Sequence, residues 1–193
     1  MEWILDKAIN FVEKYQILSD KEKNICRYGL ELFFFSNIVL ASILVLSCMI
    51  GAFLETVTFF SAFILLRVFA GGYHAKSRLS CYVLTLSIFL IFVMVVSVIP
   101  KESIYIFSFC GCFISLGIIV LRYPQVPKNK IIVNGSILKY YYASLIIGCL
   151  EASLVLIGQI LFPNSVIIFS FMFGFFTASI SVYVNDRRGK RIV

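Results

Sequence analysis

Six long apolar runs, separated by short charged segments, are the feature that most constrains this chain of 193 residues. The runs approach the length of about 20 residues that a helix needs to cross the ~30 Å hydrocarbon core of a bilayer. Hydrophobic residues make up 61% of the chain and charged residues only 14%, whereas soluble domains carry about 25% charged residues. A soluble domain of this size could not bury so much apolar surface. The pattern therefore predicts an all-α, polytopic membrane protein.

The chain is expected to form a single membrane domain over residues 1–193. Residues 1–31 would form cytoplasmic or interfacial helices, residues 32–184 the six spans, and residues 185–193 a basic cytoplasmic tail. Apolar residues at helical spacing in 2–17 predict an amphipathic helix, which either lies in the membrane interface or packs on the rest of the protein. The expected spans are 32–54, 56–70, 81–99, 103–121, 140–162 and 165–184, with a turn at Glu55 between the first two.

The basic residues alternate between the segments that connect the spans. All but one of the 17 Lys and Arg residues lie in four places: the N-terminal segment, the end of the second span with the connection that follows it, the fourth-to-fifth connection and the tail. Lys101 is the exception. Because cytoplasmic connections are enriched in Lys and Arg, both termini and these two connections are expected in the cytoplasm.

The cysteines and the single histidine give the candidate chemistry. The six cysteines show neither zinc-type spacing nor a disulfide framework, so no metal and no cofactor is expected. Cys81 stands apart because it falls at the expected N-terminus of the third span. His74 is the only histidine and precedes Cys81 by seven residues. A neighbouring imidazole and a helix N-terminus both favour the nucleophilic thiolate of a cysteine.

The spacing of His74 and Cys81 requires a bend between them. Seven residues along a straight helix would separate the two Cα atoms by about 10 Å, which is too far for a hydrogen bond between the side chains. The pair Gly71-Gly72 permits a reversal of the backbone. We therefore expect a loop or re-entrant turn at 71–80 that brings His74 to Cys81. The alternative is a basic loop with an incidental histidine and a cysteine that begins the span.

This segment resembles the signature of the AgrB family, the accessory gene regulator B proteins of Gram-positive quorum sensing. The matching residues are Arg67, Gly72, the pair His74-Ala75, and Cys81. The resemblance extends over the whole chain through its size, its amphipathic N-terminus, its spans and a linker with proline and lysine after the fourth span. Only residues 67–83 match a motif that is specific to the family, and the linker resembles the family's linker only loosely.

The resemblance implies an enzyme and a partner. It implies a cysteine endopeptidase of the bacterial cell membrane, with its active site in the cytoplasm, that removes the C-terminal tail of an AgrD-like propeptide. Cys81 would be the nucleophile and His74 the general base, while Arg67 and Gly72 would support the site. The product would be a thiolactone or lactone ring formed from a thioester. The resemblance also implies a homodimer, and a propeptide with an amphipathic leader and an acidic tail, but no nucleic-acid partner.

Glu151 supports a competing interpretation. An acid near the middle of a span is costly and usually faces the protein interior or a partner. Glu151 could pair with Arg67, accept a hydrogen bond from a hydroxyl, or remain protonated, and it is expected to support the site together with Arg67 and Gly72. It could also serve a small transporter or peptide exporter, and a non-enzymatic membrane scaffold is a third possibility. Loss of function in Glu151→Gln with tolerance of Cys81→Ser would favour transport, and the reverse would favour the protease.

Overall fold

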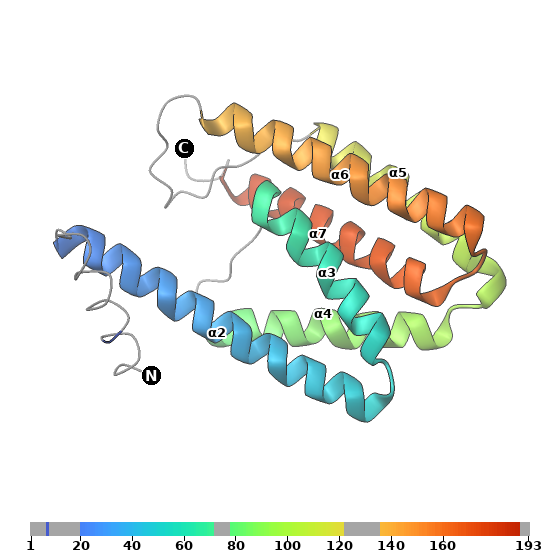
Figure 1. Ribbon diagram of the computed structural model, residues 1–193, viewed down its shortest axis with the longest axis horizontal. Coiled ribbons are helices and arrows are strands. Elements are labelled where there is room, and N and C mark those ends of the chain that lie inside the picture. Colours follow the sequence, from blue (N-terminus) through green and yellow to red (C-terminus); the bar gives the residue numbers. More distant parts are fainter. Residues whose placement is uncertain (1–6, 8–19, 72–77, 122–135, 190–193) are drawn as a thin grey trace. The chain divides into compact units, whose positions relative to one another are not determined.

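The structure is a computed structural model that describes residues 7, 20–71, 78–121 and 136–189 (Figure 1). All secondary structure in these residues is helical. The elements are α2 (Asp20–Ile50), α3 (Phe53–Ala70), α4 (Arg78–Val98), the short 3-10 helix η1 (Lys101–Ser103), α5 (Ile104–Leu121), α6 (Ser136–Leu161) and α7 (Val166–Gly189).

Six of the described helices are long and apolar enough to cross a membrane. The all-α, multi-pass prediction is therefore confirmed, and large apolar side chains such as Met49, Val98 and Leu121 are exposed on the helix surfaces, as expected of a lipid-facing surface. The predicted helix at 2–17 lies outside the described residues except for Lys7. The candidate spans are Cys26–Ile50, Phe53–Ala70, Leu79–Val98, Lys101–Leu121, Tyr141–Leu161 and Val166–Val184.

The turn between the first two spans lies earlier than predicted. It was expected at Glu55, but α2 ends at Ile50 and the backbone turns at Gly51, where φ is +79°. The N–H of Ala52 then donates to the carbonyl of Ser47 at 2.9 Å. Glycine adopts this left-handed conformation at little cost. Glu55 instead lies in the first turn of α3, where a carboxylate is favourable for the helix dipole.

The chain packs as two units, Met1–Leu46 and Ser47–Val193. In the second unit, α7 packs against α3, α5 and α6. Its approach to α3 depends on Gly174, because a Cβ atom there would lie 2.9 Å from the backbone carbonyl carbon of Phe59. A glycine therefore lets these two helices pack backbone to backbone, as small residues do in membrane bundles.

An aromatic cluster attaches α4 to this bundle. Phe92 of α4 stacks on Phe59 of α3 with 4.4 Å between ring centroids and lies 6.0 Å from Phe173 of α7. Phe59 and Phe92 are fully buried. Farther toward its C-terminus, α4 stands away from α5 and α7 and leaves an apolar cavity of about 650 Å³ between them. The contact that fixes α4 in the bundle thus lies near the middle of the helix.

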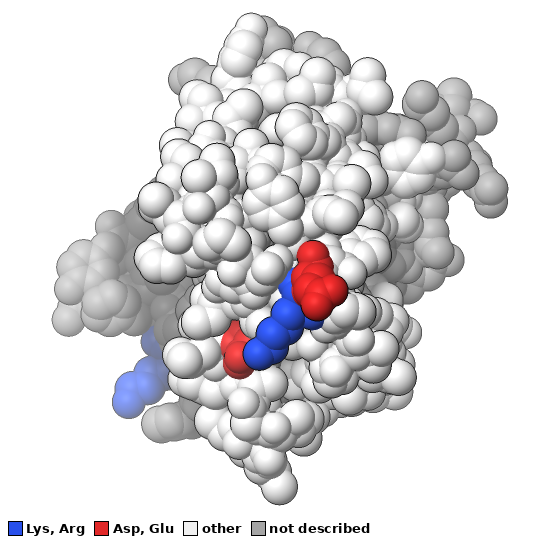
Figure 2. All heavy atoms as spheres, turned by 90° about the vertical axis from the view of Figure 1, so that its right-hand side faces the viewer, with Lys and Arg blue, Asp and Glu red and all other residues white. Residues whose placement is uncertain are grey.

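The end of the molecule where α4 leads into α5 and α6 leads into α7 has few charges. Figure 2 looks onto this end, and the charged side chains in the foreground gather in one small group, with one further basic group farther away at the lower left. Lys101 and Glu102, in the connection between α4 and α5, are exposed. The opposite end of the second unit is where α3 ends and α4 begins, because successive helices run in opposite directions.

Candidate active site

The helix α3 ends immediately before the segment that contains the single histidine. Gly71 has φ of +74°, and its N–H donates to the carbonyl of Arg67 at 3.0 Å. A left-handed glycine after the last helical residue ends a helix and redirects the chain. The backbone therefore leaves α3 at the start of the loop predicted at 71–80. The end of that prediction was wrong, because residues 78–80 belong to α4. Gly72 and His74 lie outside the described residues, so the contact of His74 with Cys81 stays a prediction.

Cys81 lies near the N-terminal end of α4 as the structure describes it. The described helix runs from Arg78, so Cys81 is its fourth described residue. The first four N–H groups of a helix have no carbonyl partner within it and carry partial positive charge. Cys81 is half-buried, so a substrate could reach its thiol. Its carbonyl accepts a hydrogen bond from the hydroxyl of Thr85 at 2.8 Å, which fixes the backbone of this turn.

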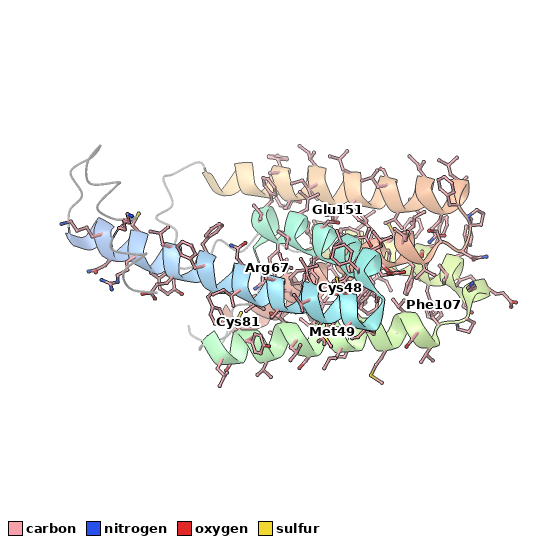
Figure 3. The ribbon with its side chains drawn as sticks, turned by 60° about the horizontal axis from the view of Figure 1, so that its bottom comes forward. Cys48, Met49, Arg67, Cys81, Phe107 and Glu151 are labelled. Atoms are coloured by element: carbon pink, nitrogen blue, oxygen red, sulfur yellow. The ribbon has the colours of Figure 1, made fainter. Side chains whose placement is uncertain are left out.

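Arg67, in the last turn of α3, is a charged group that interacts electrostatically with Cys81. The guanidinium carbon lies 5.3 Å from the ring centroid of Phe63, one helical turn earlier. Figure 3 shows Arg67 and Cys81 toward the same end of the bundle, on α3 and α4. The structure therefore brings together two residues that are 14 positions apart in the sequence.

Arg67 brings a positive charge to this site. A guanidinium remains protonated in proteins, so its positive charge is permanent. Attraction between opposite charges is stronger in surroundings of low dielectric than in water. Stacking on Phe63 adds a cation–π contact that restricts the position of Arg67. The start of α4 and the end of α3 thus both place positive charge near the thiol of Cys81.

Glu151 does not belong to this group. Its side chain is fully buried near the middle of α6, and neither carboxylate oxygen has a hydrogen-bond partner in the described part of the chain. Neither the suggested hydrogen bond from Arg67 nor one from a hydroxyl is formed. Figure 3 shows Glu151 nearer the middle of the bundle than Arg67 and Cys81. Within the described ranges, no three His, Cys, Asp or Glu side chains are grouped as metal ligands would be.

Comparison with known proteins identifies the family. The model of the family described as Accessory gene regulator B matches residues 5–182 of this chain. The chain belongs to the AgrB family. It is 26% identical over 151 residues to an AgrB-like protein of Clostridium perfringens (strain 13 / Type A), which covers 72% of this chain and 80% of that protein. No solved structure matches the chain.

Membership of the AgrB family places the chain in the accessory gene regulator system of quorum sensing, whose AgrB proteins process a propeptide. The structure adds Phe63, which the sequence analysis did not single out, and shows which glycine of the predicted pair ends α3. Phe63 supports Arg67, and its position four residues earlier on the same helix face was the available signal. Gly71 ends α3, whereas the signature directs attention to the following glycine.

Proposed function

We propose that this AgrB chain is a membrane cysteine endopeptidase that removes the C-terminal tail of an AgrD-like propeptide and promotes its cyclisation. The observation that carries the proposal is the position of Cys81, near the N-terminal end of α4 and within electrostatic reach of Arg67. A helix break at Gly71 precedes it. A cysteine protease needs this combination of an accessible thiol and positive charge that favours its thiolate.

In the first step, the sulfur of Cys81 attacks the carbonyl carbon of the scissile peptide bond. His74 accepts the thiol proton and then donates it to the leaving amine, so that the tail departs with a new N-terminus. The remaining peptide is held as a thioester on Cys81. Backbone N–H groups at the start of α4 are the proposed donors to the developing oxyanion. Arg67 and Gly72 support this geometry.

In the second step, an internal cysteine or serine of the bound peptide attacks the thioester carbonyl. The acyl group passes to that side chain, a thiolactone or lactone ring forms, and Cys81 regains its thiol. Transfer from one thiol to another changes the free energy little, so the energy of the acyl-enzyme is retained in the ring. Water must be excluded because hydrolysis would release a linear peptide. Apolar helix surfaces around the start of α4 favour that exclusion.

The charge distribution supports an acidic partner on the side of Cys81. We propose that both termini and the active site face the cytoplasm of a bacterial cell, because all basic residues but Lys101 fall in segments of one side. Such a surface attracts the acidic tail of the propeptide, while the amphipathic leader of that peptide lies on the bilayer. A homodimer is proposed from the family.

The proposal is tested by co-expression with the propeptide and mass spectrometry of the released tail. We expect Cys81→Ala to abolish the tail peptide, while Cys110→Ala, which removes an exposed thiol of α5, leaves the yield unchanged. Hydroxylamine should release the truncated peptide from wild-type protein as a hydroxamate, because it cleaves thioesters. Normal tail release by Cys81→Ala would overturn the assignment of the nucleophile.

A further inference from the structure

Four buried side-chain atoms in the described residues lack a hydrogen-bond partner, and all four are oxygens of one short segment. They are Oε1 and Oε2 of Glu151, Oε1 of Gln159 and Oδ1 of Asn164. The segment begins near the middle of α6 and ends in the turn to α7. Buried polar atoms in native proteins nearly always have a partner, either in the protein or in ordered water. Their concentration in one segment therefore indicates a common cause.

Geometry places these oxygens along a line that leads into the bundle. Glu151 and Gln159 are eight residues apart, so they share one helix face and are separated by about 12 Å along the axis. Both are fully buried. Asn164 follows in the turn at the end of α6, where its φ is +64°. The line thus begins at the α6–α7 turn and ends at Glu151.

Contacts between α6 and α7 show what surrounds Glu151. A Cβ atom at Gly158 would touch Ile168, and one at Gly148 would touch Phe175. This antiparallel register puts Glu151 about level with the residues just before Phe175, which include Gly174 at the close approach to α3. The neighbours at this level are mainly aromatic and aliphatic, so the carboxyl lies in apolar surroundings.

The chemical type of the missing partners follows from the atoms themselves. The side-chain nitrogen of Gln159 donates to the hydroxyl of Ser108 at 3.0 Å, which fixes the orientation of this amide. All four unpaired atoms are therefore hydrogen-bond acceptors. The partners must therefore be donors. Water donates two hydrogen bonds and, when buried, makes about three in total. A file of water molecules fits acceptors that are spaced along a helix face.

We propose that water enters this AgrB bundle at the α6–α7 turn and reaches Glu151, whose carboxyl exchanges a proton with the aqueous phase at that end. This end is opposite the end that holds Cys81. The proton-binding site is therefore separate from the proposed protease centre. The titratable or charged side chains on the helices packed against α6 are Glu55 and Arg67 on α3, Tyr105, Cys110 and Cys112 on α5, and Tyr183 and the group Asp186, Arg187 and Arg188 on α7.

A proton fits this site better than a metal cation. A sodium or calcium ion in a protein requires several oxygen ligands around one point. The unpaired oxygen nearest in sequence to the Glu151 carboxyl is that of Gln159, two helical turns away. A single carboxyl suffices to bind a proton, and its neutral form avoids the cost of a charge in hydrocarbon.

Infrared spectroscopy of the full chain in lipid vesicles tests the proposal. The carbonyl stretch of a neutral carboxylic acid shifts to lower frequency when its proton is replaced by deuterium. We expect a band that is absent from Glu151→Gln and that shifts within minutes of transfer to D2O. Gln159→Leu and Asn164→Gly should each slow the shift by about ten-fold, because each removes an acceptor from the water file. Glycine tolerates the positive φ of position 164.

The control is Glu102→Gln, which removes an exposed carboxyl at the same end of the bundle and should leave the band and its exchange rate unchanged. Amide I spectra establish that each variant keeps its helices. A wild-type band that fails to shift over hours would mean a dry site and would overturn the proposal. So would the absence of any band that depends on Glu151, or equal exchange rates in the wild type, Gln159→Leu and Asn164→Gly.

Discussion

Arg67 and Glu151 are both ionisable residues on membrane-spanning helices, but the chain supports them differently. Arg67 lies one turn from the end of α3, stacks on Phe63 and interacts with Cys81. Glu151 lies near the middle of α6, fully buried and without a hydrogen-bond partner among the described residues. The first residue is held by the protein, whereas the second depends on a partner that the described chain does not supply.

The difference follows from depth. Near a helix end, a long cationic side chain can reach the interface, other side chains and exposed backbone groups. In the middle of a bundle only neighbouring helices are within reach, and next to Glu151 the thiol of Cys112 on α5 already donates to the carbonyl of Ala152. A supported charge can act on a neighbouring reactive group. An unsupported carboxyl is better suited to binding a proton or water.

Replacement of Arg67 is the strongest test of this comparison. We expect Arg67→Gln to lower kcat/KM for propeptide cleavage by about 100-fold, because removal of a group that stabilises catalytic charge typically has an effect of this size. Arg67→Lys should retain part of the activity, since it keeps the charge but loses the planar stack on Phe63. The measurement is the rate of tail release in vesicles at matched protein levels.

The matched control for Arg67 is Glu151→Gln, which removes an ionisable group of the same bundle away from Cys81. Its cleavage rate should stay close to that of the wild type. If Arg67→Gln cleaved normally while Glu151→Gln did not, the roles assigned to the two residues in cleavage would be reversed.

Much of the fold could be predicted from the sequence because membrane spans have a simple physical signature. Length and hydropathy were enough to find six helices. The turn between the first two was predicted at Glu55 and lies at Gly51 instead, because hydropathy does not show which residue of a short polar break makes the turn. The backbone conformation of Gly51 decides it, and that depends on the packing of the whole turn.

The candidate site was predictable in its residues but not in its contacts. Arg67, Cys81 and a break after α3 follow from the signature and from the glycine pair. Arg67 and Cys81 lie near the ends of two different helices, so their proximity depends on how α3 and α4 pack. The position of Glu151 within a span can likewise be read from the sequence. Its lack of a hydrogen-bond partner among the described residues depends on how the helices pack.

Replacement of Glu151 by methionine tests the other half of the comparison. Glu151→Met keeps the length of the side chain and removes both unpaired acceptors. We expect the free energy of unfolding in mixed micelles to rise by about 1–2 kcal/mol, because an apolar side chain of similar size removes the cost of burying a polar carboxyl inside the bundle. Glu102→Met, at an exposed position, should change stability by less than about 0.5 kcal/mol. A less stable Glu151→Met protein would show that the carboxyl is already supported.

The smallest expected effect concerns the two glycines that bound α3. Gly51 and Gly71 have φ of +79° and +74°, so alanine at either position should cost about 1–2 kcal/mol of stability through backbone strain. Only Gly71 leads into the segment toward His74. We therefore expect Gly71→Ala to lose additional cleavage activity of about ten-fold, measured by tail release, while Gly51→Ala loses stability alone. Equal losses of cleavage would mean that general destabilisation explains both, and that the exit from α3 does not position the site around Cys81.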